Sequence, residues 1–165
     1  HYIDKKVEKS LLDEMLSAAN LAPSWKNSQT PRFYVATGEK SKNAVREALP
    51  EFNRKNSENA SAYIVTTVVL NRSGFDKDGT AVTEIGNGWG YYDLGLNNMA
   101  LLLKATELGI STLVMGIRDG EKLRKEFDIP ETEAVVSVIA VGYTDSEIVR
   151  PKRKSVEDFA KFYED

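Results

Sequence analysis

The sequence predicts a single α+β domain in which helices pack on a largely buried sheet. Two short runs, 62–70 (AYIVTTVVL) and 134–142 (AVVSVIAVG), have the apolar, β-branched composition of buried strands, and a third run, 110–115 (ISTLVM), is short and extended. Two longer runs, 8–21 and 91–108, space their apolar residues as helices do. The alternation of helices and strands is irregular and does not form neat βαβ units, which favours α+β over α/β. The 165 residues are enough for one domain with a real core.

The first third of the chain alternates between helix and strand signals. In 8–21 the apolar residues fall on one helical face, and Pro23 ends the helix. The run 32–37 (RFYVAT) predicts a strand that Gly38 breaks. A short helix is expected over 40–49, up to Pro50, whereas the polar stretch 51–60 is ambiguous.

The remaining elements surround a long helix. Residues 71–88 hold four glycines and predict a long loop, and loops of this length inside a domain are often functional. The helix over 91–108 is apolar on more than one side, so we expect it to be central, with Gly109 as its stop. Another short helix is expected over 119–127, with Asp119 as N-cap. The tail after residue 148 is basic first and amphipathic later.

Composition excludes several classes of chemistry. The chain has no Cys and one His, His1, so thiolate nucleophiles, Cys-based metal sites and mechanisms with an internal histidine base are excluded. A formal net charge of −3 gives no general attraction to nucleic acid. No apolar run is long enough for a membrane span and no signal-peptide region is evident, which predicts a cytoplasmic protein that binds no membrane. An enzyme of this composition would use carboxylates, Lys, Tyr or a cofactor.

Three stretches are weak candidates for a binding site. The glycines of 84–93 (EIGNGWGYYD) have the spacing G-x-G-x-G, a poor match to a dinucleotide fingerprint, so a flexible loop before the helix is favoured. The basic run 150–154 (RPKRK) suits a phosphate, but by itself it is more typical of a solvated face. The strand 111–117 (STLVMGI) ends at Gly116, where a planar ligand could approach the backbone, although ordinary strands also end this way.

The connection 18–33 (AANLAPSWKNSQTPRF) carries more polar side chains than a turn requires. Ser24, Asn27, Ser28 and Gln29 can donate and accept hydrogen bonds in several directions, and Trp25 adds an apolar plane. A heterocycle with carbonyl and N–H groups needs such partners. A capped turn explains the same residues equally well, and the residues by themselves leave both interpretations open.

Three segments, in this order, resemble the nitroreductase family. The first is 22–35 (APSWKNSQTPRFYV), similar to a family signature of Pro-Ser-x-x-Asn-Ser-Gln and an aromatic strand. The second is 91–117 (YYDLGLNNMALLLKATELGISTLVMGI), similar to the central helix, its Leu-Gly stop and a strand beside the flavin. The third, 134–154, resembles the last core strand and a basic phosphate-binding segment. The resemblance covers nearly the whole chain.

The resemblance implies a fold, a cofactor and an activity. Members of this family are α+β proteins with a central, mostly antiparallel sheet flanked by helices, and they form intertwined homodimers with two FMN sites at the interface. They take hydride from NADH or NADPH onto flavin N5 and pass electrons, in a ping-pong cycle, to small-molecule acceptors such as nitroaromatics or quinones. The resemblance therefore implies an FMN-dependent NAD(P)H oxidoreductase in which FMN, and no catalytic side chain or metal, carries the chemistry.

The resemblance also implies which residues bind FMN. Residues 23, 24, 25 and 27 match a segment that reaches FMN from the partner subunit, and residue 53 matches an Asn that hydrogen-bonds the isoalloxazine ring. Residues 115 and 116 match a pair whose backbone N–H groups face flavin N5. Residues 152 and 153 match a basic pair that binds the flavin phosphate. These residues are Pro23, Ser24, Trp25, Asn27, Asn53, Met115, Gly116, Lys152 and Arg153. Some members have Glu where this chain has Met115. An Arg-rich segment that holds the flavin phosphate is implied just before the position of His1, where the printed sequence begins.

The sequence leaves other functions open. The fold could serve as a flavin-binding or interaction module without turnover, or as a related flavin enzyme such as a dehalogenase. We expect one domain over 1–165 and a homodimer, because one chain supplies only part of each flavin pocket. The amphipathic end of the tail, from about residue 150, is expected to pack on the partner subunit or to cap its own core.

Overall fold

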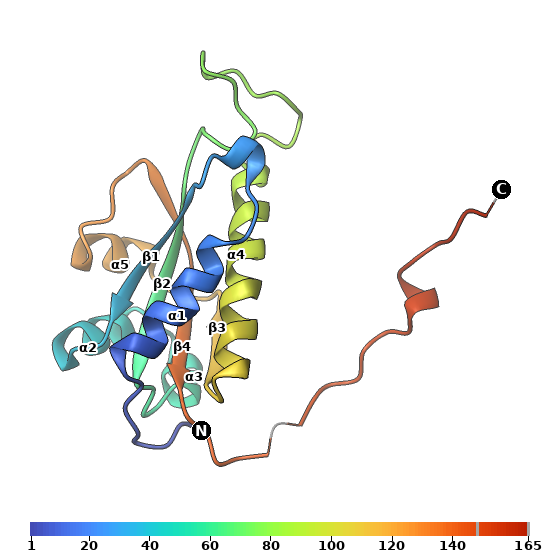
Figure 1. Cartoon of the computed structure of the whole chain (residues 1–165). Helices are drawn as coiled ribbons and strands as arrows, with labels where there is room; N and C mark the ends of the chain where they lie inside the picture. Colours follow the sequence, from blue (N-terminus) through green and yellow to red (C-terminus); the bar gives the residue numbers. More distant parts are fainter. Residues whose placement is uncertain (148, 165) are drawn as a thin grey trace.

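One four-stranded antiparallel sheet forms the centre of the molecule. The computed structural model describes residues 1–147 and 149–164. The strands are β1 (Pro31–Ala36), β2 (Ala62–Val69), β3 (Ser111–Met115) and β4 (Glu133–Gly142), in the spatial order β1-β2-β4-β3 (Figure 1). The runs 62–70 and 134–142 therefore become the two central strands, β2 and β4, which are largely buried, whereas 110–115 becomes the edge strand β3, of which only Met115 is buried.

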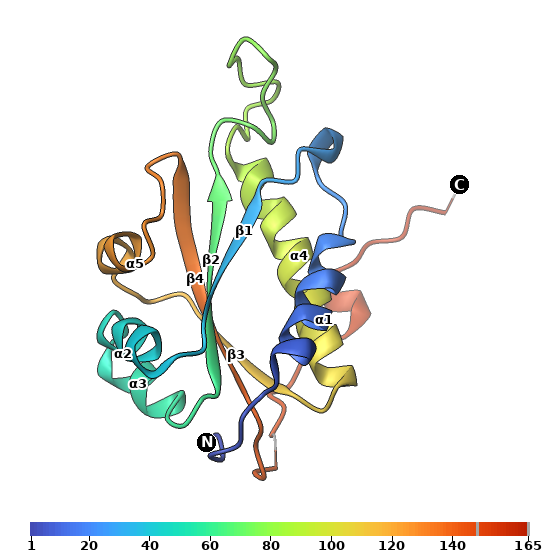
Figure 2. The same ribbon diagram turned by 60° about the vertical axis from the view of Figure 1, so that its left-hand side comes forward.

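Helices cover both faces of this sheet. On one face lie α1 (Lys9–Asn20) and the long α4 (Gly88–Glu107), which pack against each other. On the other face lie α2 (Glu39–Glu47), α3 (Glu51–Asn56) and α5 (Gly120–Glu126), as Figure 2 shows. Two short 3-10 turns complete the set, η1 (Trp25–Asn27) and η2 (Val156–Asp158).

The alternation of side chains along the central strands divides the core into two layers. Tyr63 and Val65 of β2 face α2 and α5, whereas Ile64 faces α1 and α4. Because successive side chains of a strand point to opposite faces, a strand covered on both faces is apolar at almost every position. This is why β2 and β4 have nearly continuous apolar sequences.

Most of the expected elements are confirmed, with small shifts at their ends. The predicted strand 32–37 is β1, the predicted helix 119–127 is α5, and Asp119 is its N-cap, accepting a hydrogen bond from the backbone N–H of Lys122 at 3.1 Å. The ambiguous stretch 51–60 contains α3. The helix expected over 91–108 begins earlier, at Gly88, so two glycines of the candidate phosphate loop belong to α4.

The C-terminal tail leaves the body of the protein (Figure 1). Phe159, Phe162 and Tyr163 are exposed, and the hydrogen bonds within 149–164 are local to the turn η2. The interpretation that the tail caps its own core therefore has no support in the described residues. Among those residues, no helix is both long and apolar enough to span a bilayer.

Candidate functional site

The polar connection between α1 and β1 folds into a tight turn with unusual backbone geometry. Lys26, Asn27 and Gln29 all have positive φ, between 46° and 55°. Outside glycine this left-handed region is uncommon, although Asn tolerates it better than most residues, and surrounding contacts must hold it. Here the backbone N–H of Gln29 donates to Ser24 Oγ at 3.0 Å, which closes the turn on itself.

A buried polar network fastens this turn to α4 and to the long loop. The backbone N–H of Trp25 donates to the carboxylate of Asp93, with 3.1 Å to each oxygen. Ser73 Oγ donates to Asp93 Oδ2 at 2.5 Å and lies 2.6 Å from Ser28 Oγ and 3.1 Å from Thr30 Oγ1. Thr30, Ser73 and Asp93 are at most 2% exposed, so this network excludes solvent.

Aromatic side chains border the same turn. The rings of Trp25 and Trp89 lie 4.8 Å apart, and Tyr92 meets Trp89 edge-on at 5.8 Å. Trp89 is held in place by a hydrogen bond from Nε1 to Thr83 Oγ1 at 2.7 Å. The turn, the first residues of α4 and the loop before it thus form one unit, which we call the motif half-site (residues 23–29, Ser73, Trp89 and Asp93).

A second group of predicted residues gathers where β3 ends. Met115 is buried and Gly116 is exposed, with open space where a Cβ would stand. Asn53 of α3 is only 6% exposed, and its Nδ2 donates to the carbonyl of Ile117 at 3.1 Å. Within the described residues, the backbone N–H groups of Gly116 and Ile117 have no protein acceptor. We call this group the strand-end half-site (Asn53 and residues 115–117).

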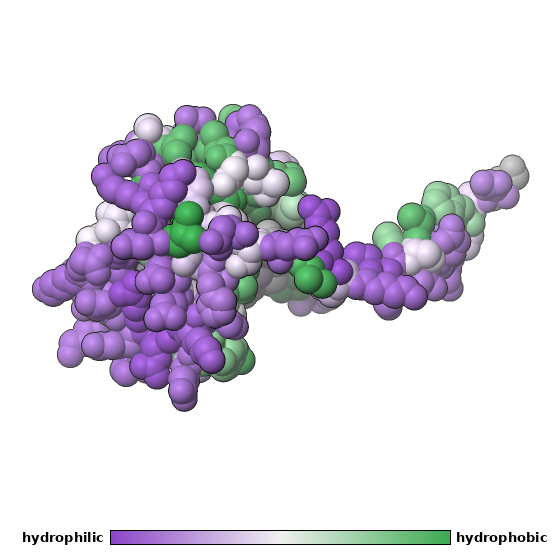
Figure 3. Space-filling model, turned by 90° about the horizontal axis from the view of Figure 1, so that it is seen from below, coloured by the Kyte–Doolittle hydropathy of each residue, from purple (hydrophilic) through white to green (hydrophobic). Residues whose placement is uncertain are grey.

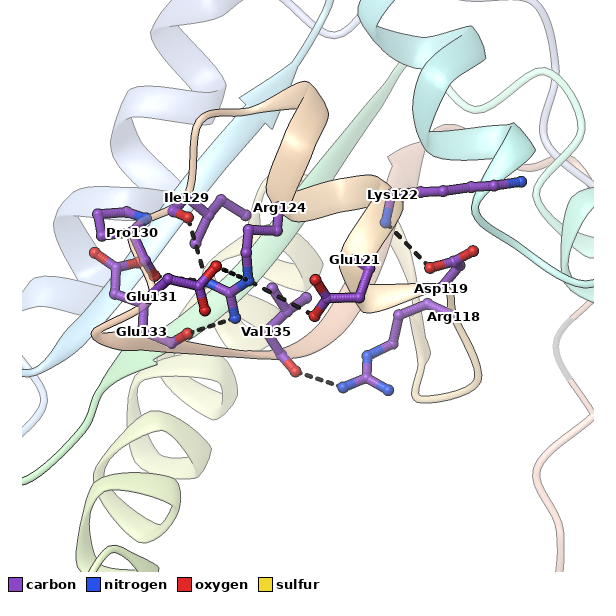
Figure 4. A network of polar contacts seen from close by, with 10 residues as sticks. All are labelled: Arg118, Asp119, Glu121, Lys122, Arg124, Ile129, Pro130, Glu131, Glu133 and Val135. Carbon is purple, nitrogen blue, oxygen red and sulfur yellow. Dashed lines mark hydrogen bonds and ion pairs between the residues drawn. The ribbon is translucent and has the colours of Figure 1, made fainter.

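Contacts of α5 and β4 hold the backbone that follows this half-site (Figure 4). The guanidinium of Arg118 donates to the carbonyl of Val135, and the backbone N–H of Asp119 donates to the carbonyl of Ala48 at 2.7 Å. Arg124 donates to the carbonyls of Pro130 and Glu133 at 2.5 and 2.9 Å. The exposed residues 116 and 117 are therefore bounded by β3 on one side and by a fixed segment on the other.

The surface has several hollows, and one of them adjoins the motif half-site. A hollow of about 310 Å³ beside the motif half-site is lined by Ser24, Gln29 and Asn97 among others. A hollow of about 260 Å³ runs along β3 and is lined by Asn56, Ser111, Thr112 and Thr144 among others. Three larger hollows, of about 520 and 530 Å³ along α2 and α3 and of about 400 Å³ beside α1, are lined by none of the predicted site residues, and the same holds for the hollow along β3.

The two half-sites are not joined within one chain. The side-chain hydrogen bonds of residues 24–29 go to α4, to the long loop and to neighbouring residues, and among the described residues none reaches the end of β3. Lys152 and Arg153 are exposed in the tail and contact neither half-site. The tail leaves the body just after Thr144 and Glu147, which line the hollow along β3. Five or six residues span at most about 20 Å, so the basic pair begins within reach of that hollow.

Pattern reasoning missed several of these residues. Asp93 and Ser73 carry the motif half-site, yet neither belongs to a recognisable motif. The available signal was Asp93 itself, the single charged residue of a largely apolar helical run (YYDLGLNNMALLL), since buried acids are rare unless they are hydrogen-bonded. Ser111 and Thr112 beside the hollow had no comparable signal, because hydroxyl residues are common in edge strands.

The most strongly shifted titrating groups lie in the core, outside both half-sites. Burial, helped by a hydrogen bond to Glu133, raises the pKa of Tyr34 to about 12. Burial, with the nearby Tyr63, raises the pKa of Tyr2 well above its usual range. The half-sites themselves offer N–H and O–H donors, an amide and aromatic surface, which are the groups that hold a planar heterocycle.

Comparison with known proteins identifies the family. A family model described as "Nitroreductase family" matches residues 1–143. A relative from Archaeoglobus fulgidus, named "Putative NADH dehydrogenase/NAD(P)H nitroreductase", is 27% identical over 153 residues, which cover 88% of this chain and 79% of the relative.

Solved structures show the same fold. A nitroreductase family protein from Streptococcus pneumoniae matches with a TM-score of 0.84 at 21% identity, over 99% of this chain and 94% of that one. A structure described as an oxidoreductase containing FMN matches with a TM-score of 0.74 at 24% identity, over 88% and 71% of the two chains. Since the family model spans most of the sequence and the fold agrees with it, the chain belongs to the nitroreductase family of oxidoreductases.

Proposed function

We propose that this chain is an FMN-dependent NAD(P)H oxidoreductase that reduces nitroaromatic or quinone-like acceptors and works as a homodimer. The observation that carries the proposal is the strand-end half-site. There, the backbone N–H groups of two exposed residues, Gly116 and Ile117, have no protein acceptor among the described residues and stand next to the buried amide of Asn53. Exposed N–H groups beside a residue without a side chain suit the polar edge of a flat heterocycle.

The residues present fit the cofactor. Gly116 leaves open space at its Cα, and the hollow along β3 offers the hydroxyls and amide of Ser111, Thr112 and Asn56 to a polyhydroxy chain. Lys152 and Arg153 supply positive charge for a phosphate. When bound, FMN would supply the hydride transfer between NAD(P)H and the acceptor, in two half-reactions. The protein's part is to bind and orient the flavin and to offer backbone N–H groups to its polar edge.

The separation of the two half-sites supports a dimer. In the proposed assembly, residues 23–27 of one chain complete the site at Met115 and Gly116 of the other. The side of α4 that faces away from the sheet exposes Tyr92, Met99 and Leu103, and Figure 3 shows hydrophobic residues gathered on one side of the body and along the tail. Exposed apolar side chains that gather on one face are typical of a protein interface.

A spectroscopic experiment tests the activity. The purified chain is incubated with FMN and freed of excess flavin, and its absorbance is followed on addition of NADH or NADPH and then of a nitroaromatic or quinone. We expect a yellow protein that bleaches with the reductant and recovers its colour with the acceptor. A protein that stays colourless refutes the proposal. Flavin that binds but is not reduced by either nucleotide instead supports a binding module without turnover.

A pair of variants tests the motif half-site. Asn27→Ala should weaken FMN binding, because residue 27 is exposed on the proposed wall of the site. Asn59→Ala is the matched control, since Asn59 is also an exposed Asn with positive φ, 61° against 55° for Asn27. Both replacements impose the same backbone strain, so a loss of FMN affinity in Asn27→Ala alone supports the site. An unchanged affinity returns this stretch to the status of a capped turn.

The dimer has its own test. Leu103→Glu places a charge on the exposed side of α4 and should shift the protein toward a monomer in size-exclusion chromatography with light scattering. Asn43→Glu adds the same charge on an exposed position of α2, on the opposite face of the sheet, and should leave the dimer intact. A wild-type monomer that carries FMN would contradict the shared site.

A further inference from the structure

Asp93 is an unusual residue for its surroundings. It is the sixth residue of α4 and is 2% exposed, yet no Lys or Arg forms an ion pair with it among the described residues. A buried carboxylate is costly unless hydrogen bonds to its charged form compensate for the lost water. Asp93 has such bonds, from the backbone N–H of Trp25 and from the hydroxyl of Ser73.

The direction of each hydrogen bond in this network follows from the number of protons. Ser73 has one hydroxyl proton, which it donates to Asp93, so it can only accept from the other hydroxyls near it. Ser28 Oγ at 2.6 Å and Thr30 Oγ1 at 3.1 Å must therefore donate to Ser73 Oγ. All hydrogen bonds of this network therefore run in one direction, toward the carboxylate of Asp93, which accepts from each of its partners.

This carboxylate holds both ends of the motif turn. Trp25 begins the turn and is bound to Asp93 directly, whereas Ser28 near its end is bound through Ser73. Between them lie Lys26 and Asn27, both with positive φ, a conformation that persists only when the surroundings impose it. Release of either end would allow the turn to relax toward ordinary backbone angles and would move the side chain of Asn27.

We infer that Asp93 is a positioning residue for flavin binding, which acts through Ser73 to hold residues 24–28 in the conformation that contacts the cofactor. The inference rests on the proposed function for the identity of the ligand, but the positioning itself does not. It assigns a role to a buried acid of α4 and links the loop before α4, through Ser73, to the binding wall.

The test uses two variants and a control. Asp93→Asn keeps the shape but replaces one acceptor oxygen by an N–H₂ group, which must then face either the Trp25 N–H or Ser73. Ser73→Ala removes the link to Ser28. Thr67→Val is the matched control: it removes a buried hydroxyl that donates to Glu133 at 2.5 Å, within the sheet and outside the network, and it keeps the β-branched shape.

The readout needs no cofactor. The chain contains two tryptophans, Trp25 and Trp89, and their rings lie 4.8 Å apart across the turn. Their coupled near-ultraviolet circular dichroism and their fluorescence therefore report on the turn, while the far-ultraviolet signal reports on the helices. FMN affinity is measured in parallel by flavin fluorescence titration, and thermal stability by the unfolding midpoint.

We expect Asp93→Asn and Ser73→Ala to lose the near-ultraviolet circular dichroism and fluorescence of the tryptophan pair, which we call the tryptophan signature, and to keep the far-ultraviolet spectrum. Both variants should bind FMN about tenfold more weakly, the loss typical of one buried hydrogen bond. Thr67→Val should lower the unfolding midpoint and leave the signature and the FMN affinity unchanged. A retained signature in both variants overturns the inference, as does a lost signature with unchanged FMN affinity. A wild-type chain that binds no FMN overturns the proposed function, while the signature still decides whether Asp93 holds the turn.

Discussion

The glycine at position 74 offers a quantitative test of how the long loop supports the motif half-site. Gly74 has φ of +85°, and a Cβ there would lie 2.6 Å from the carbonyl oxygen of Gly86 and 2.7 Å from Cδ1 of Trp89. In Gly74→Ala the left-handed conformation costs about 1–2 kcal/mol. The contact with a backbone carbonyl and an anchored ring adds about 1–3 kcal/mol, as overpacking does elsewhere. We therefore expect the free energy of unfolding to fall by about 2–5 kcal/mol.

A second glycine separates the two contributions. Gly79 has nearly the same φ, +84°, but no atom lies within 4 Å of the Cβ that alanine would add. Gly79→Ala therefore carries the backbone cost alone, and the difference between the two variants measures the steric contact. In a domain of this size, each 1 kcal/mol lowers the thermal midpoint by about 2–4 °C. Urea unfolding gives the free energies, and tryptophan fluorescence reports whether Trp89 has moved.

Equal destabilisation by the two alanines would refute the reasoning. It would mean that the loop yields at Gly74 at no cost, and hence that residues 71–87 do not hold Trp89 in place. A large effect at Gly74 with a small one at Gly79 would show instead that the base of the loop is a packed part of the site and its tip is not.

Two further predictions concern the core and the strand-end half-site. The pKa of Tyr34 is raised from its ordinary value of 10 to about 12, so between these values the unfolded chain loses the tyrosine proton first, and the free energy of unfolding should fall as pH rises from 10 to 12. In Tyr34→Phe, the urea midpoint should fall less over this range than in the wild-type chain. An identical pH profile in the two proteins would contradict the assignment. Asn53→Asp removes the donor to the carbonyl of Ile117 and places a carboxylate against it, so FMN affinity should fall at least about tenfold. Glu51→Gln on the same helix changes an exposed carboxylate and should have no such effect.

The fold was predictable because apolar periodicity and its interruptions dominate it. Because β2 and β4 are buried on both faces, their sequences are nearly continuously apolar and do not alternate between apolar and polar residues, and such a run can be recognised in the sequence. Asp119 caps α5, as its position in the sequence indicates. The start of α4 was placed too late because Gly88 and Gly90 are poor helix formers. In the structure Gly90 is in the helix because a Cβ there would lie 2.9 Å from Val68 Cγ2, so close packing on β2 overrides helix propensity.

The candidate site was predictable only in part. The segments that form the two half-sites were found, through their resemblance to a family and through the surplus of polar groups in 22–29. The residues that hold those segments were not found, since Asp93 and Ser73 act through a three-dimensional contact across 20 positions that no local pattern records. Asn53 itself was predicted through the family resemblance, but its hydrogen bond to the carbonyl of Ile117, 64 positions away, was not.

The two half-sites differ in how complete their backbone hydrogen bonding is, and this difference predicts how each responds to FMN. In the motif half-site the N–H groups of Asn27, Ser28 and Gln29 already donate, at 2.8–3.0 Å, to Ser24 and Trp25. At the strand end, those of Gly116 and Ile117 donate to no protein acceptor among the described residues. Amides that gain a partner on binding slow their hydrogen exchange most. In amide exchange followed residue by residue, FMN should therefore protect positions 116 and 117 more than positions 27–29. The opposite order would place the polar edge of the flavin against the motif turn and would remove the observation on which the proposed function rests.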